Sequence, residues 1–281
     1  MNCIFSSDIH GNKNKFEKLF KIILKETPDA VFLGGDLLPL KLKENTKMER
    51  YINNFLIKEI KKIKDTASKR IRFFLILGND DPRIYEKLFI EADKKGEIEY
   101  IHNKKYNWND FFVIGYSYVP PTPFKLKDWE RYDVSRHVDV GAISPEEGFR
   151  TVDVSQDEKQ FSTIKEDLEM LSKNTDMKKT IFLFHSPPYK TYLDRADLEG
   201  KKIDHVPLDM HVGSIAIKRF IKKNAPFLTL HGHIHESTRL TGNWNQKIGK
   251  TFSFNASHDG PELSVIRFDT DNLEKATREL I

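Results

Sequence analysis

The sequence predicts an α/β protein, and two patterns support this prediction. Short apolar runs alternate with longer amphipathic segments along the chain, as expected when strands and helices follow one another around a sheet. In addition, five of the apolar runs are followed directly by Asp, Asn or His, which places polar side chains at the strand edge where open α/β sheets bind ligands. A parallel or mixed sheet with helices on its faces is therefore the expected framework.

The expected strands are six short apolar runs. They are Cys3–Ser6, Ala30–Leu33, Ile71–Leu77, Phe111–Ile114, Thr180–Phe184 and Phe227–Leu230. Residues 48–63 carry apolar side chains mostly at three- and four-residue spacing, which predicts a helix with one buried face. After residue 236, short runs separated by glycines predict a closing set of antiparallel strands, from Ser237 to about Phe268.

Two further helices are predicted from their start signals. Ser155 and Glu158 form a capping box, and the apolar residues from Phe161 to Leu171 that follow predict one buried stripe. Ser214 is placed to cap another helix, which Asn224 and Pro226 would end.

The chain is expected to form a single domain over residues 1–281. Residues 116–148 are rich in proline and scattered aromatics and have no clear period, so they predict a long loop or insertion. Loops of this length on compact domains are often functional. We find no internal repeat, no low-complexity tract and no linker.

Composition excludes several classes of protein. The 281 residues are 38% hydrophobic and 31% charged, as in an ordinary globular protein, and no apolar run is long enough to cross a bilayer. The net charge of +4 is spread along the chain, so a nucleic acid partner is not indicated. A single cysteine, Cys3, and no visible signal peptide favour the reducing cytoplasm.

Five short blocks hold the residues that carry chemistry. Each follows an expected strand: Asp8-Ile9-His10-Gly11, Gly34-Gly35-Asp36, Gly78-Asn79-Asp80-Asp81, His185-Ser186-Pro187-Pro188 and His231-Gly232-His233-Ile234-His235. Any one block alone is explained by an ordinary turn. Five in succession at one sheet edge predict a shared site.

The chemistry of these side chains predicts a metal site. Residues i and i+2 of an extended chain face the same side, so Asp8 pairs with His10, and His233 pairs with His235. Carboxylate, amide and imidazole without thiolate suit Mn, Fe, Zn or similar divalent ions better than a structural cysteine site.

The blocks resemble those of the calcineurin-like metallophosphoesterase superfamily, which run D-x-H, G-D, G-N-H-D/E, H and G-H-x-H in this order. The resemblance extends from Asp8 to His235 and into the closing strands. It implies a four-layer α-β-β-α sandwich with two mixed sheets. It also implies two divalent metal ions, one held by Asp8, His10 and His235, the other by Asn79, His185 and His233, with Asp36 bridging them.

One position departs from the family pattern. Asp80 stands where the family usually has the histidine credited with protonating the leaving group or contacting phosphate, and a carboxylate near two cations is expected to stay ionised. Three explanations remain open: His211 or His258 supplies the proton, the substrate has a leaving group that needs little protonation, or turnover is slow. His231 lies outside the family pattern and is interpreted as a residue that supports the ligands or packs in the core, rather than as a ligand.

The function that the resemblance implies is hydrolysis of a phosphate ester by metal-activated water. The missing histidine favours phosphodiesters or activated esters. A phosphomonoesterase, including one acting on phosphoproteins, is the first alternative, and a metal-binding scaffold of the same fold with little activity is the second. The expected substrate is a small-molecule or nucleotide-like phosphate ester, with no membrane partner and no nucleic acid partner.

Overall fold

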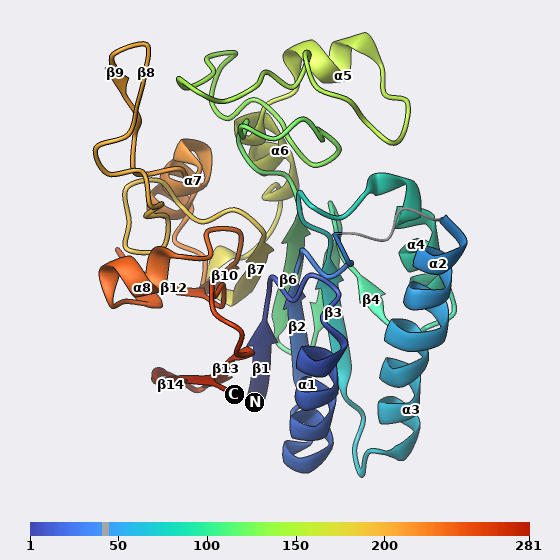
Figure 1. The fold of residues 1–281 in the computed structure, drawn as a ribbon. Helices are drawn as coiled ribbons and strands as arrows, with labels where there is room; N and C mark the ends of the chain where they lie inside the picture. The colour runs from blue at the N-terminus through green and yellow to red at the C-terminus, as the bar shows by residue number, and fades with distance from the viewer. Residues whose placement is uncertain (41–44) are drawn as a thin grey trace.

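Two six-stranded mixed sheets form the framework of the protein in the computed structural model, which describes residues 1–40 and 45–281 (Figure 1). The first sheet has the strand order β14-β13-β1-β2-β3-β4, and the second has the order β11-β12-β10-β7-β6-β5. The first contains β1 (Asn2–Ser6), β2 (Ala30–Gly34), β3 (Arg72–Ile76), β4 (Glu99–Tyr100), β13 (Ser264–Asp269) and β14 (Asn272–Leu280). The second contains β5 (Lys105–Trp108), β6 (Phe111–Tyr116), β7 (Thr180–Phe184), β10 (Leu228–His231), β11 (Asn245–Ile248) and β12 (Thr251–Asn255).

Helices connect the parallel strands of both sheets. They are α1 (Lys13–Glu26), α2 (Asn45–Tyr51), the π-helix η1 (Ile52–Ile57), α3 (Lys58–Thr66), the 3-10 turn η2 (Arg83–Tyr85), α4 (Glu86–Lys94), α5 (Gln156–Phe161), α6 (Ile164–Leu171), the 3-10 turn η3 (Met177–Lys179), α7 (Ile215–Asn224) and α8 (Ser237–Thr241). Figure 1 shows α1 to α4 beside the first sheet, with α6 and α7 beside the second. A small hairpin of β8 (Lys202–Ile203) and β9 (Val206–Pro207) projects from the same end of the molecule as α5 (Figure 1). Among the described residues, no helix combines the length and apolar character that crossing a membrane requires.

Alternation along the strands places apolar side chains on both faces of each sheet. Phe5 of β1 and Phe32 of β2 belong to one buried cluster with Leu183 and Leu230 of the second sheet, so this cluster joins the two sheets. Ile4, which precedes Phe5 in β1, packs in another buried cluster, which contains helix residues. Strands buried on both faces read as continuous apolar runs, which is why they were recognisable in the sequence. All six predicted strands are confirmed within two residues at their ends.

The helix predicted over residues 48–63 is confirmed as the continuous stretch α2-η1-α3, but the stripe predicted after Ser155 is interrupted. Ser155 caps α5 as expected, accepting a hydrogen bond from the Glu158 N–H, and α5 then ends at Phe161. Thr163 caps a new helix, α6, by accepting from the Glu166 N–H. Because the helical period restarts at Thr163, Phe161 is 56% exposed and its predicted burial is wrong.

The C-terminal segment closes both sheets, with two differences from the prediction. Residues Ser237–Thr241 form the short helix α8 instead of a strand, and β12 pairs with β10 in parallel. The antiparallel pairs of this segment are β11 with β12, β13 with β14, and β13 with β1. The short helix carries the chain away from His235 before the last strands begin.

Residues 117–155, between β6 and α5, contain only isolated β-bridges, yet buried polar contacts hold them in place. The Lys127 ammonium lies 2.5 Å from the Glu130 carboxylate, and both side chains are fully buried. Glu130 accepts hydrogen bonds from the Thr122 N–H and hydroxyl at 2.8 and 2.6 Å, and Lys127 donates to the Thr122 carbonyl. This network fixes the proline-rich part of the loop.

Burial of His102 makes the stability of the folded protein depend on pH. Its ring is buried against Tyr118 and Trp129 and accepts from the Ser117 N–H, and burial, with the nearby charge of Arg83, lowers the pKa of His102 well below 6.5. Between the two pKa values the unfolded chain binds a proton that the folded protein does not, so stability falls as the pH drops below about 6.5. The wild type should lose unfolding free energy when the pH falls from 7 to 5, and in His102→Gln this loss should be smaller by about 2 kcal/mol. Urea unfolding at both pH values measures it.

The matched control for this prediction is His137→Gln. The His137 side chain is 78% exposed, so its replacement removes one histidine without changing the buried surroundings of His102. If both variants changed the pH dependence of the unfolding free energy equally, burial of His102 would not be the cause.

Candidate metal centre

The seven residues expected to bind metal all lie at the carboxyl ends of strands. Asp8 and His10 follow β1, Asp36 follows β2, and Asn79 follows β3 in the first sheet. From the second sheet, His185 follows β7, and the pair His233 and His235 follows β10. Because parallel strands of both sheets end at this side of the molecule, residues far apart in sequence converge there.

The loops that carry these residues are joined through their backbones. The Asp8 N–H donates to the Gly35 carbonyl at 3.0 Å, and the His10 N–H donates to the Asp36 carbonyl at 2.8 Å. Asp8, His10, Asp36 and His233 have φ values of 57°, 48°, 52° and 75°, in the left-handed region that disfavours residues with a Cβ. Strain of this kind persists where the surrounding structure enforces it, which is characteristic of functional sites.

Two glycines leave the space that the site needs. A Cβ on Gly78 would lie 2.3 Å from Oδ1 of Asp36 and 2.6 Å from Cε1 of His185. A Cβ on Gly232 would lie 2.6 Å from Oδ2 of Asp8. The glycines of the third and fifth sequence blocks are therefore required by close packing against the candidate ligands.

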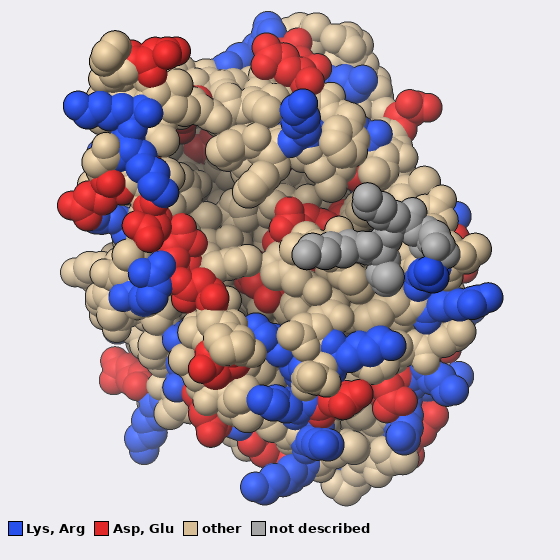
Figure 2. Space-filling model, viewed as in Figure 1, with Lys and Arg blue, Asp and Glu red and all other residues tan. Residues whose placement is uncertain are grey.

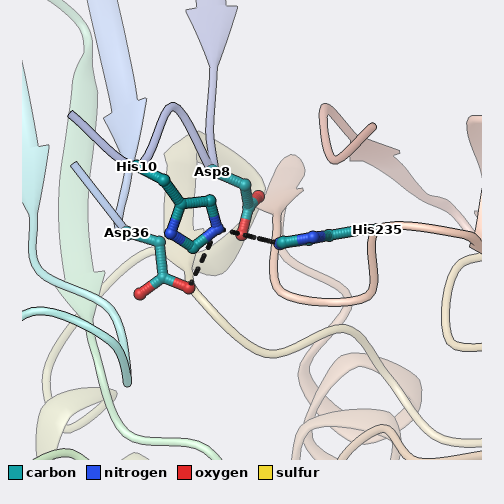
Figure 3. A group of neighbouring side chains, drawn as sticks. All are labelled: Asp8, His10, Asp36 and His235. Atoms are coloured by element: carbon teal, nitrogen blue, oxygen red, sulfur yellow. Dashed lines mark hydrogen bonds and ion pairs between the residues drawn. The ribbon is translucent and has the colours of Figure 1, made fainter. Parts of the chain in front are cut away.

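One group of candidate ligands consists of Asp8, His10, Asp36 and His235, whose donor atoms all lie within 4.8 Å of one another (Figure 3). Nε2 of His10 is 3.2 Å from Nε2 of His235, and the latter is 3.3 Å from Oδ1 of Asp8. Nε2 of His10 is 3.9 Å from Oδ2 of Asp36. Figure 3 shows the four side chains directed toward a common point.

The second group surrounds His185. Its Nε2 is 3.0 Å from Oδ1 of Asn79 and 3.3 Å from Oδ2 of Asp36, and its ring centroid is 5.2 Å from that of His233. Asp36 thus lies near both groups through the same oxygen, Oδ2. Nδ1 of His185 faces the Gly34 carbonyl at 2.8 Å, and because a carbonyl only accepts, Nδ1 carries the hydrogen and Nε2 offers its lone pair.

Hydrogen bonds also orient the carboxylates. Asp8 accepts from the His233 N–H at 3.0 and 3.2 Å and from the Ser257 hydroxyl at 2.9 Å. Asp36 accepts from the Asp80 N–H at 2.9 Å through Oδ1, which leaves Oδ2 for the site. Asp81 is fully buried and accepts from the backbone N–H groups of Leu37, Leu38 and Gly78, so it ties the second block to the third.

The electrostatics of the site favour positive charge between its carboxylates. Burial alone would lower the pKa of His185, but the charge and hydrogen bond of Asp36 raise it to about 10. Burial likewise opposes the shift at His235, where the hydrogen bond and charge of Asp8 raise the pKa to about 9. Burial and the charge of His185 lower the pKa of His233 to about 3, which keeps that imidazole neutral.

These residues fit divalent cations. The donor set is carboxylate, amide and imidazole, which suits borderline divalent metals. The lone pair of His185 Nε2 faces two oxygen acceptors, and such an arrangement is stable only with a cation or a proton between the atoms. Only neutral imidazoles bind metal, so a bound cation would replace the protons that Asp36 and Asp8 stabilise on His185 and His235.

Four other residues were singled out in the sequence, namely Asp80, His211, His231 and His258. Asp80 lines the same cavity as Asp36, and Oδ2 of Asp80 is 3.8 Å from Nδ1 of His10. Burial and the charge of Asp36 raise the pKa of Asp80 to about 7. The lowered pKa expected from the sequence is the effect of two nearby cations, which would act in the opposite direction.

Three further histidines were singled out in the sequence: His211, His231 and His258. Of these three, only His211 lines the cavity that the candidate ligands also line. His231 is fully buried, its two ring nitrogens contact the Ser186 carbonyl and the Thr229 hydroxyl, and it stacks on Phe184. Nε2 of His258 is 2.9 Å from Glu262, and its ring is not among the residues that line the cavity.

Three residues that support the site were missed in the sequence. Ser257 reaches Asp8 from 249 residues away, and Asp194 is a buried carboxylate whose Oδ1 lies 2.9 Å from Nδ1 of His211. Neither has a local signal. Asp81 has one, because it occupies the D/E position of the third block.

Comparisons with known proteins agree with the fold. A family model described as calcineurin-like phosphoesterase matches residues 1–237. The crystal structure of TT1561 from Thermus thermophilus is similar with a TM-score of 0.60 at 18% identity, over 99% of this chain and 98% of that one. That of a dimetal phosphatase from Danio rerio has a TM-score of 0.55 at 10% identity, over 95% of this chain and 92% of that one. No curated protein matches the sequence.

Proposed function

The chain belongs to the calcineurin-like phosphoesterase family, and we propose that it is a dinuclear metal-dependent enzyme that hydrolyses phosphate esters, with a preference for phosphodiesters. In this proposal Asp8, His10 and His235 hold one divalent ion and Asn79, His185 and His233 hold the other. The α-β-β-α layer order and a cytoplasmic location belong to the same proposal. Mn, Fe and Zn are the metals that the ligand set suits.

The observation that carries the proposal is the position of Asp36. Its Oδ2 lies 3.9 Å from Nε2 of His10 in one group and 3.3 Å from Nε2 of His185 in the other. A carboxylate that lies between two groups of potential ligands is suited to bridge two cations. Two bound divalent ions would stabilise the charge on the phosphoryl oxygens and lower the pKa of attacking water.

The protein's own residues would orient this chemistry. Ser257 and the His233 N–H fix the Asp8 carboxylate, and the Gly34 carbonyl fixes the tautomer of His185. The Asp80 N–H holds Asp36. Because these supports are hydrogen bonds within the folded protein, the ligands need little reorganisation when metal binds.

The experiment that tests the proposal measures metal content and turnover on one sample. After reconstitution with Mn²⁺ or Zn²⁺, we expect about two ions per chain and faster hydrolysis of bis-p-nitrophenyl phosphate than of p-nitrophenyl phosphate. A higher rate on the monoester would favour the phosphomonoesterase. Metal binding without turnover of either ester would favour the scaffold, and failure to bind metal would refute the proposal.

We also propose that His211 protonates the leaving group, in place of the histidine that Asp80 replaces. Nδ1 of His211 must carry the hydrogen shared with Asp194, because a carboxylate only accepts, and this leaves Nε2 for exchange of a proton with substrate. Asp194 itself is held by the Lys190, Thr191 and Gly213 N–H groups. A carboxylate held in this way fixes the tautomer and the orientation of the His211 ring.

The resulting prediction concerns leaving groups. In His211→Gln, hydrolysis of diesters with alkyl or phenol leaving groups should slow by roughly 10²-fold, while p-nitrophenyl esters should lose far less because their leaving group needs little protonation. Rates across a series of phenyl esters measure the difference. His258→Gln is the control, and an equal loss on all leaving groups would assign His211 a structural role.

A further inference from the structure

A cavity of about 490 Å³ opens beside the candidate metal ligands. Asp36, Asn79, Asp80, His233 and His235 line one side of it. In the space-filling view the molecule is hollowed at this place, and tan residues form most of the wall (Figure 2). Its volume lies within the range of roughly 300–1,000 Å³ that is usual for small-molecule sites.

Much of the remaining wall of the cavity is apolar. Pro123, Phe124, Val134 and Val140 contribute from the loop after β6, and Ile203 and Leu208 contribute from the β8–β9 region. Phe124 is 57% exposed, Val140 48% and Ile203 42%, so apolar surface is open to solvent on these segments. Burial of such surface by a ligand would be favourable in proportion to the area covered.

The two segments that form this wall lie close together at Gly141 and Ile203. Gly141 has a φ of +87°, and a Cβ on it would lie 2.8 Å from Cδ1 of Ile203. The loop is fixed at its other end by the contacts of Thr122 with the buried Lys127–Glu130 pair. The apolar wall is therefore a built feature, positioned before any ligand arrives.

The charges around the cavity select against further anionic groups. Among the described residues that line it, none is Lys or Arg, whereas Asp133, Asp139, Asp209 and Glu236 add carboxylates to those of the metal centre. Arg136, between the lining residues Ser135 and His137, pairs with Glu146 at 2.9 Å. A second phosphate or a carboxylate on the substrate would face this negative field.

We propose that the substrate is a phosphate ester with an uncharged hydrocarbon or aryl group, which occupies the apolar cavity while the phosphate lies at the metal centre. This inference rests on the proposed function and narrows it: nucleotides with several phosphates and nucleic acids would be disfavoured as substrates. The non-bridging oxygens of one phosphate would be the sole anionic atoms of the bound part.

The test uses the reconstituted full-length enzyme and p-nitrophenyl alkyl phosphates, which share one leaving group. Between the ethyl and hexyl esters, kcat/KM should rise by about threefold for each methylene that becomes buried. An ester with a terminal carboxylate on a chain of matched length should react at least tenfold more slowly than the hexyl ester. Equal rates for ethyl, hexyl and carboxylated esters would overturn the inference and leave the proposed function standing.

A binding measurement keeps the inference separate from turnover. Calorimetric titration of the metal-loaded protein with ethylphosphonate and hexylphosphonate should give a smaller Kd for the hexyl compound, whether or not any ester is hydrolysed. Equal Kd values would refute the apolar site. Absence of turnover with a preference for hexylphosphonate would refute the proposed activity alone.

Variants of two matched phenylalanines locate the effect. Phe124→Ser should lower the hexyl-to-ethyl ratio, because Phe124 lines the cavity. Phe161→Ser should leave it unchanged, since Phe161 is similarly exposed at 56% but does not line the cavity. Equal effects of both substitutions would show that the preference arises outside the cavity.

Discussion

Asp36→Asn is expected to bind fewer than two metal ions per chain and to lose on the order of 10³-fold in turnover of bis-p-nitrophenyl phosphate. Asn has the same shape and can still accept from the Asp80 N–H, so the loop should keep its conformation. The change removes the negative charge that both groups of ligands share through Oδ2. Elemental analysis and initial rates on the same preparation measure both effects.

The outcome separates bridging from a local structural role. Asp110→Asn, at an exposed position between β5 and β6, controls for the loss of one negative charge and should retain full metal content and rate. If Asp36→Asn retained two ions and normal turnover, Asp36 would not bridge metals. If its circular dichroism spectrum differed from that of the wild type, the loss would instead reflect unfolding.

The sequence predicted the elements whose signals are local. The six strands were found because each is a short run of apolar residues, and the seven candidate ligands were found because each lies in the short block that follows such a run. Parallel strands bring these positions to one edge, whatever the packing of the rest. Asp8 and His235 therefore meet at 3.3 Å although 226 residues lie between them.

Features that depend on tertiary contacts were not predictable. Thr163 ends one helical period and begins another through its own capping hydrogen bond, and this exposes Phe161. Ser257 contacts Asp8 from the connection between β12 of the second sheet and β13 of the first. The irregular segment after β6 has no period at all, so its contribution to the cavity wall follows from the buried contacts of Thr122 and Glu130, which no spacing reveals.

Gly78→Ala is expected to remove metal binding and activity together, although the substitution adds a single methyl group. The added Cβ would lie 2.3 Å from Oδ1 and 2.6 Å from N of Asp36, and 2.6 Å from Cε1 of His185. Contacts this short must be relieved, and two of the neighbours are a backbone atom and a ring held by the Gly34 carbonyl. Relief therefore displaces the loops that position the ligands, with a further loss of about 1–3 kcal/mol in unfolding free energy.

Gly96→Ala provides the control that distinguishes displacement of the site from general destabilisation. Gly96 has a φ of +70°, and a Cβ on it would meet no atom within 4 Å. Alanine there should cost about 1–2 kcal/mol through backbone strain alone. Metal content and turnover should stay at wild-type values.

Urea unfolding, elemental analysis and initial rates of both variants give the comparison. Because the two variants are expected to be similarly destabilised, loss of metal in Gly78→Ala alone would show that packing of Gly78 against Asp36 and His185 holds the site. Loss in both would mean that metal binding simply follows overall stability.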